Sequence, residues 1–187
     1  MKCSKLMISG LPKTFDVTYA GDYVQPTDDG IQPEDILYDF YFADADEDKG
    51  EEGLMLFKYN ESATGIYLVH NPHLQTLAVE LSPWASEVDV LLYGVFINEV
   101  LAKHKRARLY DKYTPLKGVT DDDVQRMIKE RKAHLKRLLT TKEGFTMEGL
   151  NADYEVTVAH LWPDMQPEVW VQELQRQFVA MQWEHED

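Results

Sequence analysis

The pattern of apolar and polar residues changes near residue 83. Before this point, short stretches that alternate apolar and polar side chains, or are rich in aromatic residues, are separated by turn-forming Gly, Pro, Asn and Asp residues. This pattern is typical of strands joined by tight turns, and it predicts an antiparallel sheet. The predicted strands are Thr14–Tyr19, Ile36–Phe42, Leu54–Tyr59, Ile66–Val69 and Leu77–Leu81.

After residue 83, apolar residues recur every three or four positions, which predicts helices. The first helix, Glu87–His104, is apolar nearly all round, as buried helices are. The second, Asp121–Leu139, has one apolar stripe and is rich in Lys and Arg elsewhere. The third, Glu168–Trp183, follows Pro167, and proline is favoured in a first helical turn. Two further strands are predicted at Ala107–Tyr110 and Tyr154–Val158.

The first two predicted helices begin with the spacing of a capping box. Ser86 precedes Asp89 by three residues, and Thr120 precedes Asp123 by the same distance. In such a box the two side chains and the two main-chain N–H groups exchange hydrogen bonds, which fixes the start of the helix. Gly94 weakens the first helix by about 1 kcal/mol relative to alanine. We therefore expect Gly94 to pack closely against another element.

Together these elements predict an α+β fold, in which an antiparallel sheet of about five to seven strands, mostly N-terminal, packs against about three helices, one of them buried. We expect a single domain over residues 1–187, strand-rich in 1–82 and helix-rich in 83–187, because the sequence shows no repeat or linker. The terminus around Cys3 is expected to be mobile. We expect a loop at Lys112–Gly118. The stretch between Gly144 and Gly149 is expected to be a loop or a short turn.

The composition disfavours several classes of protein. Apolar residues make up 44% and aromatic residues 11%, which is too much for a disordered chain. No apolar run approaches the roughly 18 residues of a membrane span, and the N-terminus lacks the apolar core of a secretory signal. Cys3 is the only cysteine, so an intrachain disulfide or a cysteine-based metal cluster is excluded. We expect a cytoplasmic protein, and no motif implies a cofactor.

The net charge of −14 is unevenly distributed. Residues 1–99 contain 18 acidic and 5 basic side chains, whereas residues 102–142 contain 13 basic and 5 acidic ones. The overall charge disfavours nonspecific binding to nucleic acid, because an acidic surface repels a polyanion. Two interpretations of the basic segment stay open. It could form a local anion site, or it could neutralise acidic strands of its own fold.

The densest charge lies in residues 44–52, which we call the acidic segment. The side chains that could bind a partner with a basic surface are Asp44, Asp46, Glu47, Asp48, Glu51 and Glu52. Carboxylates at alternate positions are typical of a calcium-binding loop. The segment does not match an EF-hand, however, because that loop needs glycine at its sixth position and glutamate at its twelfth, where this chain has Lys49 and Met55. The alternative to a binding surface is an exposed connection whose charges oppose aggregation at the sheet edge.

The second candidate is the basic segment 103–137, which could bind a phosphate or nucleic-acid ligand. Its candidate side chains on the second helix are Arg126, Lys129, Lys132, Lys136 and Arg137. No aromatic stacking residues or helix-turn-helix accompany them, so a solvated helix face is the alternative. His70 and His73 have an H-x-x-H spacing, but the intervening Asn71-Pro72 favours a turn over a zinc site.

Known catalytic motifs are absent from the sequence, including the nucleophile elbow, the glycine-rich phosphate loops and H-E-x-x-H. We therefore expect a non-enzymatic cytoplasmic protein that binds a protein partner through its acidic segment. Two alternatives stay open. One is a phosphate or nucleic-acid ligand on segment 103–137, and the other is a metal-dependent hydrolase that uses carboxylates.

Overall fold

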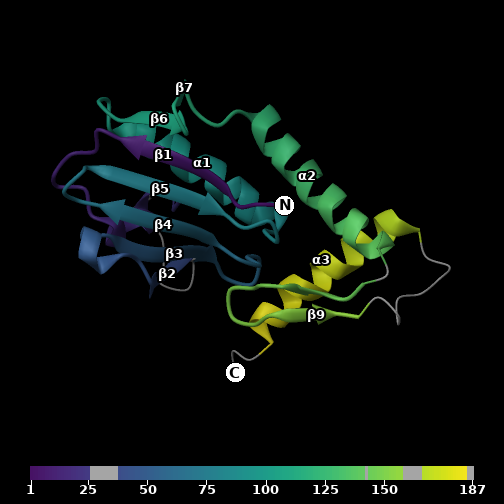
Figure 1. Cartoon of the computed structure of the whole chain (residues 1–187). Coiled ribbons are helices and arrows are strands. Elements are labelled where there is room, and N and C mark those ends of the chain that lie inside the picture. Colours follow the sequence, from purple (N-terminus) through teal and green to yellow (C-terminus); the bar gives the residue numbers. More distant parts are fainter. Residues whose placement is uncertain (26–37, 142, 158–165, 185–187) are drawn as a thin grey trace.

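The computed structural model describes residues 1–25, 38–141, 143–157 and 166–184. The strands of its large sheet are β1 (Ser4–Ser9), β2 (Tyr38–Ala43), β3 (Glu52–Lys58), β4 (Ile66–Asn71), β5 (Thr76–Leu81), β6 (Arg108–Asp111) and β7 (Thr114–Leu116). They are all antiparallel to their neighbours, in the order β2-β3-β4-β5-β1-β6-β7 (Figure 1). A separate pair consists of β8 (Phe145–Met147) and β9 (Tyr154–Val156). The helices are α1 (Glu87–Lys103), α2 (Asp121–Thr140), α3 (Pro167–Trp183) and the short 3-10 helices η1 (Val17–Tyr23) and η3 (Glu47–Lys49).

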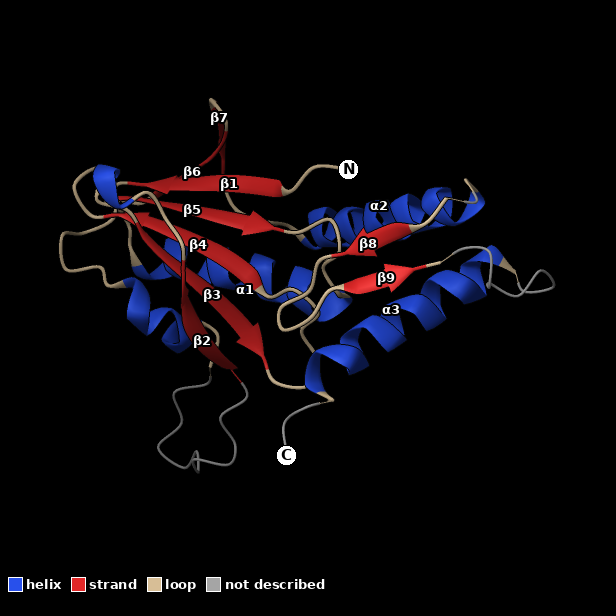
Figure 2. Cartoon of the chain, turned by 60° about the horizontal axis from the view of Figure 1, so that its bottom comes forward, coloured by secondary structure: helices blue, strands red, loops and turns tan. Residues whose placement is uncertain are grey.

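Helix α1 covers one face of the large sheet (Figure 2). Alternate strand residues point toward it, because successive side chains of a strand face opposite sides. The helix buries Val90, Tyr93, Phe96, Ile97 and Val100 against strand residues that include Ile8, Leu54, Leu68 and Val79. The structure therefore confirms both the α+β fold with its antiparallel sheet and the buried character of this helix.

Helix α2 joins two hydrophobic clusters. Its first half contributes Val124 and Met127 to the cluster around α1. Its second half contributes Leu135 and Leu139 to a second cluster with α3, β8 and β9. A side chain at Gly94 would meet Val124 Cγ2 at 3.1 Å, so the expected close packing at this glycine is confirmed.

Both predicted capping boxes are present. The Ser86 hydroxyl accepts a hydrogen bond from the Asp89 N–H at 3.2 Å, and the Asp89 carboxylate accepts one from the Ser86 N–H at 3.0 Å. The same exchange joins Thr120 and Asp123, at 3.1 and 2.9 Å. The predicted starts of α1 and α2 are therefore correct.

The strand predicted at Thr14–Tyr19 is wrong, because Val17–Tyr23 forms η1. The Asp16 carboxylate accepts hydrogen bonds from the main-chain N–H of Thr18 at 2.9 Å and from its hydroxyl at 2.6 Å. Such local bonds compete with strand pairing and favour a helical turn. The apolar residues of this stretch still reach the core, since Val17 and Ala20 are buried.

The expectation of a mobile N-terminus is also wrong. Ser4–Ser9 forms β1 inside the sheet, where Met7 pairs with Ala78 of β5 and Tyr110 of β6. The loops predicted after Asp111 and after Gly144 contain β7 and β8, each only three residues long. A strand of three residues is too short to show the alternation of apolar and polar side chains. It is identified only by its pairing with a neighbouring strand.

The edges of two other predicted strands cannot be compared. Residues 36 and 37 and residue 158 lie outside the described residues. Within the described part of the chain, no helix has the length and apolar character needed to cross a membrane.

Candidate functional site

The acidic segment has a defined backbone conformation that β4 holds in place. The Tyr67 hydroxyl donates a hydrogen bond to the carbonyl oxygen of Asp44. The side-chain amide of Asn71 donates to the carbonyl oxygen of Lys49 at 3.2 Å. Asp46 caps η3, with its carboxylate accepting from the Lys49 N–H at 3.3 Å. The carboxylates of the segment are thus presented from an ordered turn, which lowers the entropy lost on binding.

Most of the negative charge on this segment is not neutralised by the fold. Five of its six carboxylate side chains are exposed, and Glu51 is half-buried. Lys49 pairs with Asp46 at 3.5 Å, and His70 Nδ1 lies 3.3 Å from Glu52. Across the described ranges, the other four carboxylates form no ion pair. They remain available to a partner.

The acidic segment lines a hollow of about 460 Å³ between the end of β2 and the start of η1. The carboxylates around this hollow are Asp16, Asp44, Glu47, Glu51 and Glu52. Asp46 and Asp48 belong to the same segment but lie outside the hollow's lining. Side-chain and main-chain hydrogen bonds from Thr18 lower the pKa of Asp16. The hollow therefore concentrates negative charge from two parts of the chain.

Asp16 and Phe42 also belong to this hollow, although neither stands out as a candidate residue in the sequence. The Phe42 side chain is 72% exposed and packs edge-to-face on Phe40 at 5.7 Å between ring centroids. In the sequence, Phe42 is one of several aromatic residues in a predicted strand, and nothing there indicates that its side chain is exposed. Nothing in the local pattern indicated that η1 lies beside β2.

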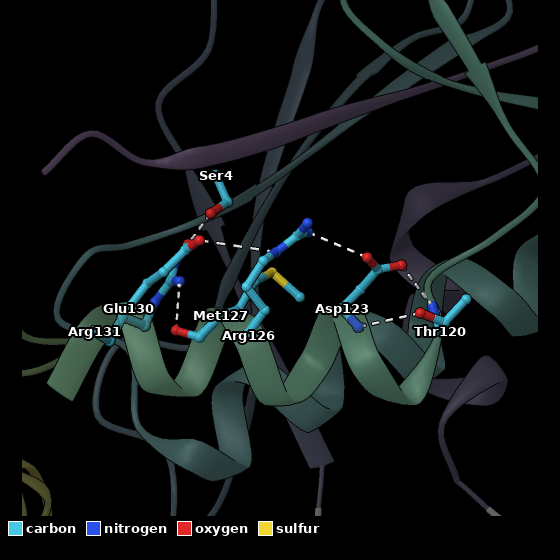
Figure 3. A network of polar contacts seen from close by, with 7 residues as sticks. All are labelled: Ser4, Thr120, Asp123, Arg126, Met127, Glu130 and Arg131. Atoms are coloured by element: carbon cyan, nitrogen blue, oxygen red, sulfur yellow. Dashed lines mark hydrogen bonds and ion pairs between the residues drawn. The ribbon is translucent and has the colours of Figure 1, made fainter. Parts of the chain in front are cut away.

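Two of the candidate anion-binding residues pair with other side chains of α2. Arg126 lies between Asp123 and Glu130, at 3.2 and 3.8 Å (Figure 3). Arg137 donates a hydrogen bond to His134 Nδ1 at 3.2 Å. Burial, with smaller contributions from the positive chain terminus and Arg137, lowers the pKa of His134. The neutral imidazole is the form that can accept this bond.

Two further candidates pair with acidic residues of the other helices. Lys132 lies 2.5 Å from Glu87 of α1, and Lys136 lies 2.5 Å from Glu168 of α3. Lys129 is exposed, and within the described ranges it makes no ion pair. The candidate basic residues of α2 are thus largely paired within the fold, with acidic residues of the helices and not with those of the strands.

The two histidines of the H-x-x-H spacing are separated by the structure. His70 lies in β4, is 3% exposed and packs against the Phe15 ring at 5.0 Å. His73 lies in the exposed turn that follows. Among the residues that the structure describes, no group of three or more His, Cys, Asp or Glu side chains is placed to hold a metal ion.

The arrangement as a whole offers a fixed, negatively charged hollow with an exposed aromatic ring at its edge. Carboxylates and an aromatic face suit the ammonium or guanidinium groups of another molecule. No family model, no curated protein and no solved structure matches this chain.

Proposed function

We propose that this protein is a non-enzymatic, cytoplasmic binding module that recognises a protein partner with a basic surface. The observation that carries the proposal is the hollow in which five carboxylates from two separate parts of the chain come together. A concave surface with one sign of charge focuses the electric field and accelerates the approach of an oppositely charged partner. The acidic segment and this hollow would form the contact surface.

Phe42 supports this proposal because it adds an apolar contact to the charged one. Lys and Arg side chains have apolar stems and charged heads. A stem could pack on the exposed ring of Phe42 while the head pairs with Asp44 or Glu47 beside it. The phosphate-ligand alternative has less support, because Arg126, Lys132 and Lys136 already form ion pairs with carboxylates of the helices.

Reversing the charge of three exposed carboxylates should abolish most of this binding. The variant combines Asp44→Lys, Glu47→Lys and Asp48→Lys. The immobilised wild-type protein would capture partners from a cell lysate, and calorimetry would then give the affinity of each purified partner. We expect the variant to bind at least about tenfold more weakly, and wild-type binding to weaken as salt rises.

The matched control reverses three exposed carboxylates near β8 and β9, through Glu143→Lys, Glu148→Lys and Glu155→Lys. It has the same net charge as the test variant, so it separates a local contact from a general change of charge. We expect its affinity to stay within about threefold of wild type. Equal affinity of the test variant and the wild type would refute the proposal.

A further inference from the structure

A second concave surface lies on another part of the sheet, between β1 and α2. This groove has a volume of about 740 Å³. Residues 3–7 form one wall, and the side chains of Asp123, Arg126, Met127 and Glu130 of α2 form the other. Figure 3 shows these four side chains and Ser4. At about 3.3 Å per residue, the β1 wall is about 13 Å long. The groove therefore has the length of about four residues of extended chain.

Part of the β1 wall of the groove is a strand edge without a partner strand in the described part of the chain. β1 pairs with β5 over residues 4–8, but with β6 only over residues 7–9. β6 ends at Asp111, where Lys112 takes a positive φ of 54° and turns the chain into β7. On this side, residues 4–6 have no partner strand among the described elements. Such an edge offers main-chain donors and acceptors to an added strand.

Tyr93 lies beneath this edge and carries a buried hydroxyl. The side chain is 1% exposed, and within the described structure its oxygen forms no hydrogen bond of standard geometry. Burial raises the pKa of Tyr93, and the charge of Arg131 and, to a smaller extent, the Leu6 N–H oppose this shift. The Leu6 N–H lies beside this hydroxyl, and both residues line the groove. Strand alternation gives Ser4 and Leu6 the same main-chain orientation. A carbonyl placed beside Leu6 would give the Tyr93 hydroxyl an acceptor.

Arg131 holds the edge in a fixed position. Its guanidinium donates to the Ser4 hydroxyl at 3.2 Å, and to the carbonyl oxygens of Leu81 and Ser82 at 3.3 and 2.9 Å. These bonds tie the start of β1 to the end of β5 and to α2. Figure 3 shows the bond to Ser4. A preformed edge loses little conformational entropy when it binds.

We propose that this groove binds an extended peptide segment of a partner protein, which adds a strand beside residues 4–6 of β1. The charged side chains around the groove balance one another, with Asp111, Asp123 and Glu130 against Lys5, Lys112 and Arg126. Its apolar lining includes Leu6, Val119 and Met127. The fitting peptide therefore has little net charge and alternates apolar and polar residues. This partner chemistry differs from the basic surface proposed for the acidic segment.

A random twelve-residue peptide library displayed on phage, panned against the full-length protein, tests this proposal. The enriched peptide would be synthesised and its affinity measured for the wild type, Ser4→Ala and Ser4→Pro. Both variants lose the hydroxyl, but only proline lacks the N–H and places a ring at the edge, and proline is tolerated at the first residue of a strand. We expect Ser4→Ala to bind within about threefold of wild type and Ser4→Pro at least about tenfold more weakly.

Two further measurements keep the test valid if Ser4→Pro folds poorly. Amide hydrogen exchange at Ser4 and Leu6 should slow at least about fivefold when the wild type is saturated with the peptide. Tyr93→Phe should fold nearly as well as wild type, since the hydroxyl forms no hydrogen bond of standard geometry within the described structure. It should bind the peptide about two- to tenfold more weakly.

Three outcomes would overturn the proposal. The library could enrich no peptide, or the enriched peptide could bind Ser4→Pro as well as Ser4→Ala without protecting the Ser4 and Leu6 amides. Alternatively, these amides could become protected as the concentration of the free protein rises. That last result would assign the groove to a second copy of this chain.

Discussion

Replacing Asp89 by alanine is expected to destabilise the protein by about 4 kcal/mol, because several buried donors would lose their acceptor at once. Asp89 is 0% exposed. Its carboxylate accepts from the main-chain N–H groups of Ala63, Thr64 and Gly65 at 2.9, 2.9 and 3.1 Å, and from that of Ser86 at 3.0 Å. One side chain thus caps α1 and holds the turn between β3 and β4.

Urea unfolding followed by circular dichroism would measure this loss. The control is Asp122→Ala, which removes an exposed carboxylate from the first turn of α2 and should cost less than about 1 kcal/mol. Asp89→Asn should fall between the two, since it keeps the shape but replaces one acceptor oxygen by a donor. If Asp89→Ala cost no more than Asp122→Ala, this account of the turn would be wrong.

Replacing Arg131 by alanine is expected to cost about 3 kcal/mol and to loosen β1. The side chain is 1% exposed, and burial lowers the pKa of its guanidinium. Alanine would leave a cavity and remove the donors that face the carbonyl oxygens of Leu81 and Ser82. Amide exchange in residues 4–8 should accelerate in this variant.

Arg126→Ala is the matched control, because Arg126 is on the same helix but its side chain is 63% exposed. Exposed ion pairs contribute about 0–1 kcal/mol, so its stability should stay close to that of the wild type. Arg131→Met separates the two parts of the effect, since methionine refills the space but donates no hydrogen bond. Unchanged exchange in β1 after Arg131→Ala would show that this arginine does not hold the strand.

The acidic segment was predictable, but its hollow was not. Six carboxylates in residues 44–52 are visible in any reading of the sequence. Asp16 reaches the same hollow because it caps η1, which lies beside β2. Similarly, the partners of Lys132 and Lys136 come from α1 and α3. Contacts between distant segments leave no local pattern.

The position of Arg131 in the sequence already indicates that its side chain is buried. Arg131 follows Met127 by four residues and precedes Leu135 by four, so it lies on the apolar stripe of α2 and not among the solvent-facing basic residues. A charged residue on an apolar stripe indicates a buried contact that satisfies it. The structure supplies these contacts at the junction of β1, β5 and α2.

The sequence by itself determined the α+β class, the starts of α1 and α2 and the central strands β3, β4 and β5, because capping boxes, helical periods and strand alternation are local signals. Only the tertiary structure decided the place of β1, the short strands β7 and β8, the acidic hollow and the groove beside α2. Each of these depends on main-chain or side-chain partners that are distant in the chain. The energy of such contacts is gained only when the whole sheet and its helices have assembled.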